Sequence, residues 1–369
     1  MSNNERSSNF TIHPSTHPAT DEVRTARLAE PGFGRYFTDH IARLTYSHGE
    51  WSGGSVEAYA PISLDPVASV LHYGQAVFDG FKAYAQPDGG ISVFRPLDNA
   101  RRFQASARRL AMPELPVELF LESTELLVRQ DRIWVPKNVG ESLYLRPLMI
   151  ATEPALGVRP STDYLYLLIA SPAGAYFPRG IKPLTVWISQ DYVRASPGGT
   201  GAAKCAGNYA GSLAAQRQAQ EMGCEQVIWL DAVERRYIEE LGGMNIAFVF
   251  RRPDGGHTLV TPELTGTLLP GVTRMSLLTL AADLGLTVEE RKIDLQEIDR
   301  TVANGTLAEV FACGTAAVIT PVARMRGTEI DWQVGDGTPG RISMLLRESL
   351  LNIQHGRAPD THGWMHKIL

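Results

Sequence analysis

Short apolar runs alternate with amphipathic segments along the chain and predict a mixture of strands and helices. The segments predicted as strands are 91–94, 142–150, 163–170, 185–188, 226–230, 237–240, 245–250, 310–313 and 317–320. Residues 98–110 predict a helix, because apolar residues recur there every three to four positions and Asp98 suits the N-cap. Residues 272–284 predict another, which ends at Gly285. Regular strand–helix repeats are few, so a mixed α/β or α+β fold is favoured over a doubly wound sheet.

A segment rich in proline and glycine, 171–183, marks the best candidate for a domain boundary. The first twenty residues are polar and lack an apolar run. The expected divisions are a flexible tail over 1–22, a small α/β domain over 23–173, a linker over 174–184 and a large domain over 185–369.

Composition narrows the class of protein. The chain has 369 residues, a formal net charge of −5 and 44% hydrophobic residues, which is typical of a globular protein without nucleic-acid partners. Three widely spaced cysteines form neither a disulfide framework nor a zinc pattern, which indicates a reducing compartment. No segment predicts a secretory signal or a membrane span, and His362 and His366 lack a third metal ligand. We therefore expect a cytoplasmic protein with no metal and no membrane partner.

The glycine-rich segment 197–209 contains a lysine with two possible roles. The segment is not a P-loop, because Lys204 follows an alanine and precedes a cysteine, and it lacks the third glycine of a dinucleotide fingerprint. A lysine in such a loop is usually a solvated surface charge. However, small residues surround Lys204 and an apolar stripe begins at Ala210, so a neutral, nucleophilic amine is also possible.

Three places in the sequence can bind a phosphate. The helix start at 269–273 offers free N–H groups, and the turn at 314–316 offers amides and a hydroxyl. The third is a predicted helix with four arginines, namely Arg101, Arg102, Arg108 and Arg109. Each also has an ordinary explanation as a helix start, a turn or a solvated face. Glu240 and Asn245 flank a turn between strands, where a carboxylate can pair with a ring nitrogen or serve as a cap.

In this order, seven segments resemble the branched-chain amino-acid aminotransferases, which are pyridoxal-phosphate (PLP) enzymes of fold type IV. The segments are HYGQAVFDGFKAY (72–84), FRPLDNARRF (94–103), YLRP (144–147), VRASPGGTGAAKCAGNYA (193–210), EELGGMN (239–245), LLPGVTR (268–274) and CGTAAV (313–318). The resemblance runs from about residue 32 to residue 356. It implies a smaller N-terminal α/β domain and a larger C-terminal domain with mixed, barrel-like sheets and helices.

The resemblance also implies roles for individual residues. Lys204 is the catalytic residue that forms a Schiff base with PLP. The implied phosphate ligands are Arg102, Thr315 and the amides of Val272 and Thr273; the other cofactor-binding residues are Arg194, Tyr209 at the phenolic oxygen and Glu240, rather than Glu239, at the pyridine nitrogen. The implied substrate-binding residues are Tyr73, Phe78, Tyr144, Arg146, Gly243, Thr315 and Ala316.

The activity implied is a reversible ping-pong transamination of L-leucine, L-isoleucine and L-valine with 2-oxoglutarate. The implied partners are amino acids, 2-oxo acids and a second copy of the chain in a homodimer. Two departures from the animal enzymes stand out. Residues 317–320 read AVIT where those enzymes carry a redox Cys-x-x-Cys, and Gly243 replaces a pocket threonine. Thiol control is therefore not expected, and the preference among substrates stays open.

Two other classes of function remain as alternatives. A D-amino-acid aminotransferase or an aminodeoxychorismate lyase would keep the fold and the cofactor, although YLRP and EELGGMN match the branched-chain group better. A non-catalytic homologue that only binds a metabolite is the remote alternative, because the set from Arg102 to Thr315 is intact.

Overall fold

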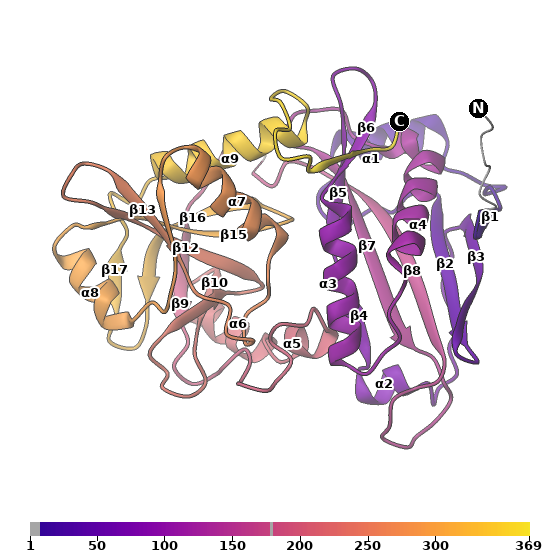
Figure 1. Cartoon of the computed structure of the whole chain (residues 1–369), viewed down its shortest axis with the longest axis horizontal. Helices are drawn as coiled ribbons and strands as arrows, with labels where there is room; N and C mark the ends of the chain where they lie inside the picture. Colours follow the sequence, from indigo (N-terminus) through magenta and orange to yellow (C-terminus); the bar gives the residue numbers. More distant parts are fainter. Residues whose placement is uncertain (1–7, 178–179) are drawn as a thin grey trace. The chain divides into compact units, whose positions relative to one another are not determined.

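The computed structural model describes residues 8–177 and 180–369, and the chain divides into two compact units (Figure 1). Unit 1 takes in the chain up to Tyr176 and again from Gln354, and unit 2 lies between these positions in sequence. No helix in the described part of the chain is long and apolar enough to cross a membrane.

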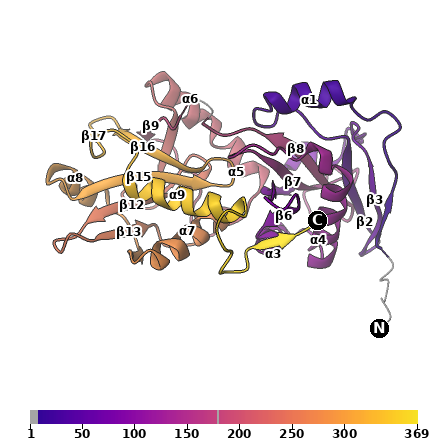
Figure 2. The same cartoon turned by 90° about the horizontal axis from the view of Figure 1, so that it is seen from above.

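Unit 1 is built on a largely antiparallel sheet in which nine strands are described. Its order is β1 (Phe10–Ile12), β3 (Glu50–Ala58), β2 (His40–Ser47), β8 (Tyr164–Ala173), β7 (Ser142–Ala151), β5 (Phe81–Ala85), β6 (Ile91–Phe94) and β18 (Met365–Lys367), with β4 (Ala76–Phe78) also paired to β7. The helices are α1 (Asp21–Ala29), α2 (Ser69–Tyr73), α3 (Pro96–Arg109) and α4 (Val117–Gln130), with the short 3-10 helix η1 (Arg132–Trp134). Figure 2 shows α3 and α4 on one face of this sheet and α1 on the other.

Unit 2 contains a closed barrel. Six of its described strands pair in a ring, namely β11 (Ile238–Leu241), β10 (Gln226–Leu230), β9 (Leu184–Ile188), β16 (Val318–Arg326), β15 (Leu307–Gly314) and β12 (Met244–Arg251), which pairs back to β11. Beyond the ring lie β13 (His257–Thr261), β14 (Thr287–Glu290) and β17 (Asp331–Gln333). The helices are α5 (Ala206–Ala210), α6 (Leu213–Glu221), α7 (Val272–Asp283), α8 (Leu295–Ala303) and α9 (Arg341–Gln354).

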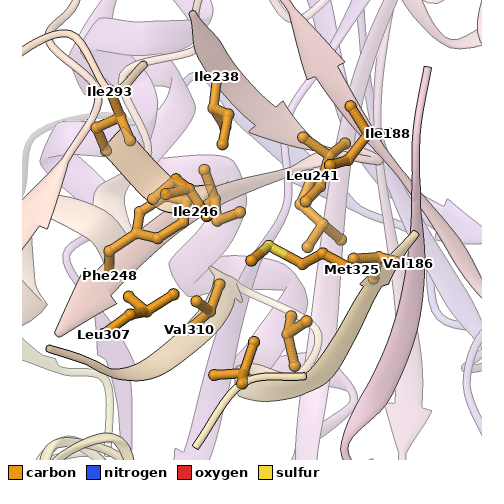
Figure 3. Close-up of a cluster of buried hydrophobic side chains, with 14 of the residues drawn as sticks. Val186, Ile188, Ile238, Leu241, Ile246, Phe248, Ile293, Leu307, Val310 and Met325 are labelled. Atoms are coloured by element: carbon orange, nitrogen blue, oxygen red, sulfur yellow. The ribbon is translucent and has the colours of Figure 1, made fainter. Parts of the chain in front are cut away.

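Alternate residues of the ring strands fill the barrel with apolar side chains. Ile228 and Leu230 of β10 lie in this interior cluster. Figure 3 shows other members of the cluster, among them Phe248 of β12. The other side chains of β10, Val227 and Trp229, pack against the alanines of α6 in a second cluster. Because residues 227–230 of β10 are buried on both faces, they form an uninterrupted apolar run.

The mixed α/β architecture with a barrel confirms the predicted fold class. The strand predicted at 226–230 is β10, and α7 ends one residue before the predicted helix end. The predicted N-cap at Asp98 is wrong. Helix α3 begins at Pro96, which suits a first turn because its missing N–H is not needed there, and Arg95 precedes it with φ +47°. Asp98 lies in that first turn and pairs with Arg95 at 2.7 Å.

Both chain ends differ from expectation. Residues 1–7 of the expected tail and 178–179 of the expected linker lie outside the described residues. Within the tail, β1 pairs in parallel with β3, and Phe10 is buried. The segment from Gln354 onward belongs to unit 1 rather than to the second domain, because β18 pairs with β6 and Ile368 is 2% exposed.

Candidate functional site

Lys204 of unit 2 lies just before α5, and its amine contacts a phenol. Lys204 Nζ donates to Tyr209 Oη at 2.7 Å and lies 5.1 Å from the centre of the Tyr209 ring. Tyr209 stands on α5, five residues further along the chain. The lysine is half-buried. An amine placed beside a hydroxyl in a half-buried position is suited to nucleophilic and proton-transfer chemistry.

The glycine-rich loop before Lys204 is built for close packing. A Cβ at Gly201 would lie 2.1 Å from the carbonyl oxygen of Thr267, so only glycine fits this approach. The side chain of Asn208 donates to the carbonyls of Thr200 (2.8 Å) and Ala203 (2.9 Å). The glycines therefore let the loop approach a neighbouring segment, and Asn208 fixes the backbone next to the lysine.

Glu240 on β11 is the most buried carboxylate near Lys204, at 1% exposed. Its Oε2 lies 2.9 Å from Arg194 Nε, and its Oε1 accepts the Leu269 N–H at 2.6 Å. The register of the barrel places Asn245 opposite it, and Asn245 Nδ2 donates to the Leu269 carbonyl at 3.0 Å. The position of the Glu240 carboxylate is thus fixed by an ion pair with Arg194 and by a hydrogen bond from the Leu269 backbone N–H.

The ionisation of Glu240 reflects this environment. Burial raises the pKa of Glu240 to about 7, and the positive charge of Arg194, the Leu269 N–H and the charge of Lys204 each lower it in part. Because the charge of Lys204 acts on Glu240, the amine and the carboxylate share one electrostatic environment. A cation brought to this carboxylate would favour its charged form.

A β-bulge separates Glu240 from its neighbour Glu239. Trp229 of β10 lies opposite Glu240 and the next residue, Leu230, lies opposite Ile238, so Glu239 is the extra residue. Glu239 accepts a hydrogen bond from the Thr267 hydroxyl and lines a separate cavity of about 250 Å³. The ion pair at 2.9 Å therefore joins Arg194 to Glu240, whereas Glu239 is hydrogen-bonded to Thr267.

The start of α7 has the features of an anion site. Its N-cap, Gly271, provides no capping side chain, so the first N–H groups of the helix have no side-chain acceptor of that kind. A Cβ at Gly271 would lie 2.0 Å from Asn245 Oδ1, so the helix starts close to the residue paired with Glu240. Val272 and Thr273 open the helix and are buried. These N–H groups and the helix dipole favour a phosphate or carboxylate.

Thr315 and Ala316 lie in the turn that joins β15 to β16. Pairing of Gly314 with Val318 closes this turn. Val318 has φ +64°, a left-handed conformation that is rare for a β-branched residue. Such backbone is enriched at functional sites.

Gly243 belongs to the two-residue turn between β11 and β12. Leu241 pairs with Met244 across it, and the first turn residue, Gly242, has φ +58°. A Cβ at Gly243 would lie 3.3 Å from the ring of Tyr209. The glycine therefore sits directly against the tyrosine that contacts Lys204.

In unit 1, three of the predicted residues form an aromatic and cationic cluster. The guanidinium of Arg146 lies 4.9 Å from the ring centre of Phe78 and 5.2 Å from that of Tyr144, and its Nη2 donates to Tyr144 Oη at 2.8 Å. Arg146 Nε is buried without a hydrogen-bond partner among the described residues. A Cβ at Gly80 would lie 2.0 Å from Tyr144 Oη, so this glycine leaves room for the tyrosine.

The other two predicted residues of unit 1 have separate contacts. Arg102 Nε and Nη2 donate to the buried carboxylate of Asp79 at 2.9 and 2.5 Å, and Nη2 also donates to Asn99 at 3.2 Å. Tyr73 on α2 is 44% exposed and donates its hydroxyl to the carbonyl of Leu156. The structure thus does not place Tyr73 with the cluster around Arg146.

Two residues that form hydrogen bonds with predicted site residues were missed in the sequence, namely Asp79 and Thr267. Asp79 directly follows Phe78 within the segment 72–84, so its place in a matched motif was an available signal. Nothing in the sequence marks Thr267. It matters because its carbonyl accepts from Arg194 at 2.8 Å and its hydroxyl donates to Glu239, which only the fold reveals.

Comparison with known proteins identifies relatives over nearly the whole chain. The family model described as amino-transferase class IV matches residues 76–325. The branched-chain-amino-acid aminotransferase of Mycolicibacterium smegmatis is 60% identical over 361 residues, which are 97% of this chain and 98% of that protein.

Two solved structures are similar to the fold at lower identity. The Escherichia coli branched-chain amino acid aminotransferase is 29% identical with a TM-score of 0.73, covering 90% of this chain and 99% of that one. The branched-chain amino acid aminotransferase from Thermobaculum terrenum, solved in its PLP form, is 25% identical with a TM-score of 0.72, covering 90% and 99%.

Proposed function

The chain belongs to the class IV aminotransferases, and from this premise we propose that it transfers amino groups between L-leucine, L-isoleucine or L-valine and 2-oxoglutarate. The products are the branched 2-oxo acids and L-glutamate, and the reaction runs in both directions. The observation that carries the proposal is the Lys204 amine, 2.7 Å from Tyr209 and in the electrostatic environment of the buried Glu240–Arg194 pair. The 60% identity to a branched-chain enzyme supports the substrate class.

The donor set of unit 2 fits PLP. The cofactor combines a carbonyl group, a ring nitrogen and a phosphate. Lys204 offers an amine, Glu240 a buried carboxylate and the start of α7 a set of uncapped N–H groups. When bound, PLP withdraws electrons from the substrate Cα and so makes its C–H bond acidic.

Lys204 has the central proton-transfer role in this proposal. Its Nζ would take the proton from the substrate Cα as a general base and would then donate it, as a general acid, to the cofactor carbon that receives the amino group. The Tyr209 hydroxyl limits where Nζ can lie, because the two atoms are already 2.7 Å apart. Asn208 supports this by holding two carbonyls of the glycine-rich segment, those of Thr200 and Ala203, just before the lysine.

The charged residues around Lys204 stabilise the cofactor. Glu240 keeps the pyridine nitrogen protonated, and Arg194 orients that carboxylate through the 2.9 Å ion pair. The phosphate is bound by the amides of Val272 and Thr273 and by Thr315. The family resemblance also assigns Arg102 to the phosphate, and a guanidinium has five N–H donors, so it can bind a further oxygen beside the Asp79 carboxylate.

The proposed substrate residues divide by chemistry. The amides of Thr315 and Ala316 bind the α-carboxylate. Phe78 and Tyr144 provide apolar faces for the branched side chain, and Arg146 provides the charge for the distal carboxylate of 2-oxoglutarate. The remaining members of this set are Tyr73 and Gly243.

Assembly, compartment and domain roles complete the proposal. We propose a homodimer, which the family resemblance supports, and a cytoplasmic location, which fits three buried free cysteines. We also propose that the two units act as two domains joined across 174–184, with Lys204 in the second.

Initial rates test the activity directly. The purified protein with added PLP should convert L-leucine and 2-oxoglutarate into L-glutamate, with parallel double-reciprocal lines when both substrates are varied. Lys204→Ala should reduce this rate about 10²–10⁴-fold or more, whereas Lys137→Ala in unit 1 should not change it. A rate with L-leucine that is unchanged in Lys204→Ala would refute the assignment of the lysine.

The alternative activities give different results in the same assay. Faster turnover of D-alanine than of L-leucine would indicate a D-amino-acid aminotransferase. Release of pyruvate from aminodeoxychorismate without an amino acceptor would indicate a lyase. Binding of PLP without turnover of any amino acid would indicate a non-catalytic homologue.

A further inference from the structure

Unit 1 contains a cavity of about 570 Å³ that involves none of the residues of the proposed active site. It lies among α1, the β5–β6 hairpin, η1 with the segment that follows it, and the end of the chain beyond α9. Its apolar lining includes Ile91, Ile133 and Val139. A concave site of this size, mostly apolar with a few polar groups, is suited to a small organic molecule.

The charged side chains that line this cavity are all positive. They are Arg24, Arg132, Lys137 and Arg357. Lys137 and Arg357 have no ion-pair partner among the described residues. The nearby Asp88 is not among the lining residues; it accepts the Gly90 N–H at 2.8 Å and lies 3.4 Å from Lys367. Cations gathered in a concave surface raise the local concentration of anions.

A buried imidazole also lines the cavity without a partner. His355 is 8% exposed, and its Nε2 has no hydrogen-bond partner in the described part of the chain. Its ring packs edge-on against Tyr84 at 5.0 Å. Burial, and then the charges of Arg357 and Lys82, lower the pKa of His355 to about 4, so the ring is neutral at pH 7. Buried polar atoms are almost always hydrogen-bonded, and a bound ligand would supply the missing partner.

We propose that this cavity is a binding site for a small organic anion with an apolar group. The anionic head, a carboxylate or a phosphate ester, contacts Lys137, Arg357 and His355, and the apolar group packs against Ile133 and Val139. The site is independent of the proposed transamination, because none of its residues has a role in that reaction.

Phenyl phosphate is a suitable probe, titrated calorimetrically into the PLP-loaded enzyme at low ionic strength. We expect saturable binding that weakens in 0.5 M NaCl. The double variant Lys137→Ala/Arg357→Ala should weaken it about tenfold or more, since both cations contact the head group. The control Arg108→Ala/Arg217→Ala removes two exposed charges elsewhere and should leave the affinity unchanged. L-leucine turnover should be equal in both double variants, which separates this site from the active site.

The related probes decide each part of the proposal. Phenylacetate that binds with the same dependence on Lys137 and Arg357 would show that a carboxylate head is accepted as well. Inorganic phosphate that binds as tightly as phenyl phosphate would overturn the apolar part, and phenol that binds equally would overturn the anionic part. Equal affinities in the two double variants would overturn the site itself, even if transamination is confirmed.

Discussion

Replacing Glu240 by glutamine in the cofactor-free protein should change how its stability depends on pH. In the folded state, burial raises the pKa of Glu240 from the ordinary value of 4.5 to about 7. The native state therefore binds this proton more tightly than the unfolded state does. The stabilising contribution of the protonated group is complete below pH 4.5 and is lost as the pH rises through 7.

The size of the effect follows from the shift. At about 1.4 kcal/mol per pH unit, a rise from 4.5 to about 7 corresponds to roughly 3 kcal/mol. Glutamine has nearly the same shape and does not titrate. The free energy of unfolding of the wild type, minus that of Glu240→Gln, should thus fall by roughly 3 kcal/mol between pH 4.5 and pH 7.5.

Urea unfolding of both apo-proteins at several pH values measures this difference. Subtracting the variant cancels the titration of all other groups that the substitution leaves unperturbed. Glu221→Gln, at a side chain that is 69% exposed, serves as the control and should run parallel to the wild type. If the curve for Glu240→Gln is also parallel throughout this range, the carboxylate is not buried as described and the reasoning is refuted.

Three further variants test the site and the core. Lys204→Ala should reduce the transamination rate about 10²–10⁴-fold or more through loss of the general base, and a coupled L-glutamate assay with unchanged circular dichroism would show this. Tyr209→Phe removes the hydroxyl 2.7 Å from Lys204 Nζ and should lower kcat by up to about tenfold, so an unchanged kcat would count against the contact. Phe248→Ala empties a fully buried position in the barrel and should cost about 3–5 kcal/mol in urea unfolding. Leu213→Ala, at a residue 66% exposed, should cost far less.

The central strands could be predicted because their buried residues are consecutive in the sequence and form apolar runs. In β10 the inward residues fill the barrel and the outward residues meet α6, so nearly every position of the strand is apolar. The start of α3 was harder to predict, since Asp98 and Pro96 are both good helix-start residues. The proline prevailed, and Arg95 adopted a left-handed conformation before it.

The chain ends could not be predicted, because their partners lie far away in sequence. β1 and β18 have three residues each and no clear periodicity. Their placement depends on free edges that β3 and β6 offer only after the sheet has formed. A local pattern carries no information about such an edge.

For the candidate site, the sequence indicated which residues take part, but most of the contacts between them could be seen only in the structure. Lys204 and Tyr209 are five residues apart on one loop and helix, so their contact is nearly local. Arg194 and Glu240 are far apart in sequence, and their ion pair depends on the barrel closing. Asp79, which follows β4, was missed because its partner Arg102 is also distant in sequence and lies on α3.

Strand β11 contributes apolar side chains to the barrel interior and a carboxylate to the candidate site, and it contains a β-bulge between them. Ile238 and Leu241 both lie in the apolar interior, although strict alternation would turn residues three positions apart to opposite faces. The extra residue, Glu239, resolves this conflict, and it leaves Glu240 level with Trp229, whose side chain packs against α6 outside the barrel. Both ends of the strand therefore contribute to the core, while the carboxylate faces Arg194 and Leu269. The pairing with Trp229 therefore keeps Glu240 on the outward face, and the residue that the bulge adds is Glu239, whose carboxylate accepts from the Thr267 hydroxyl.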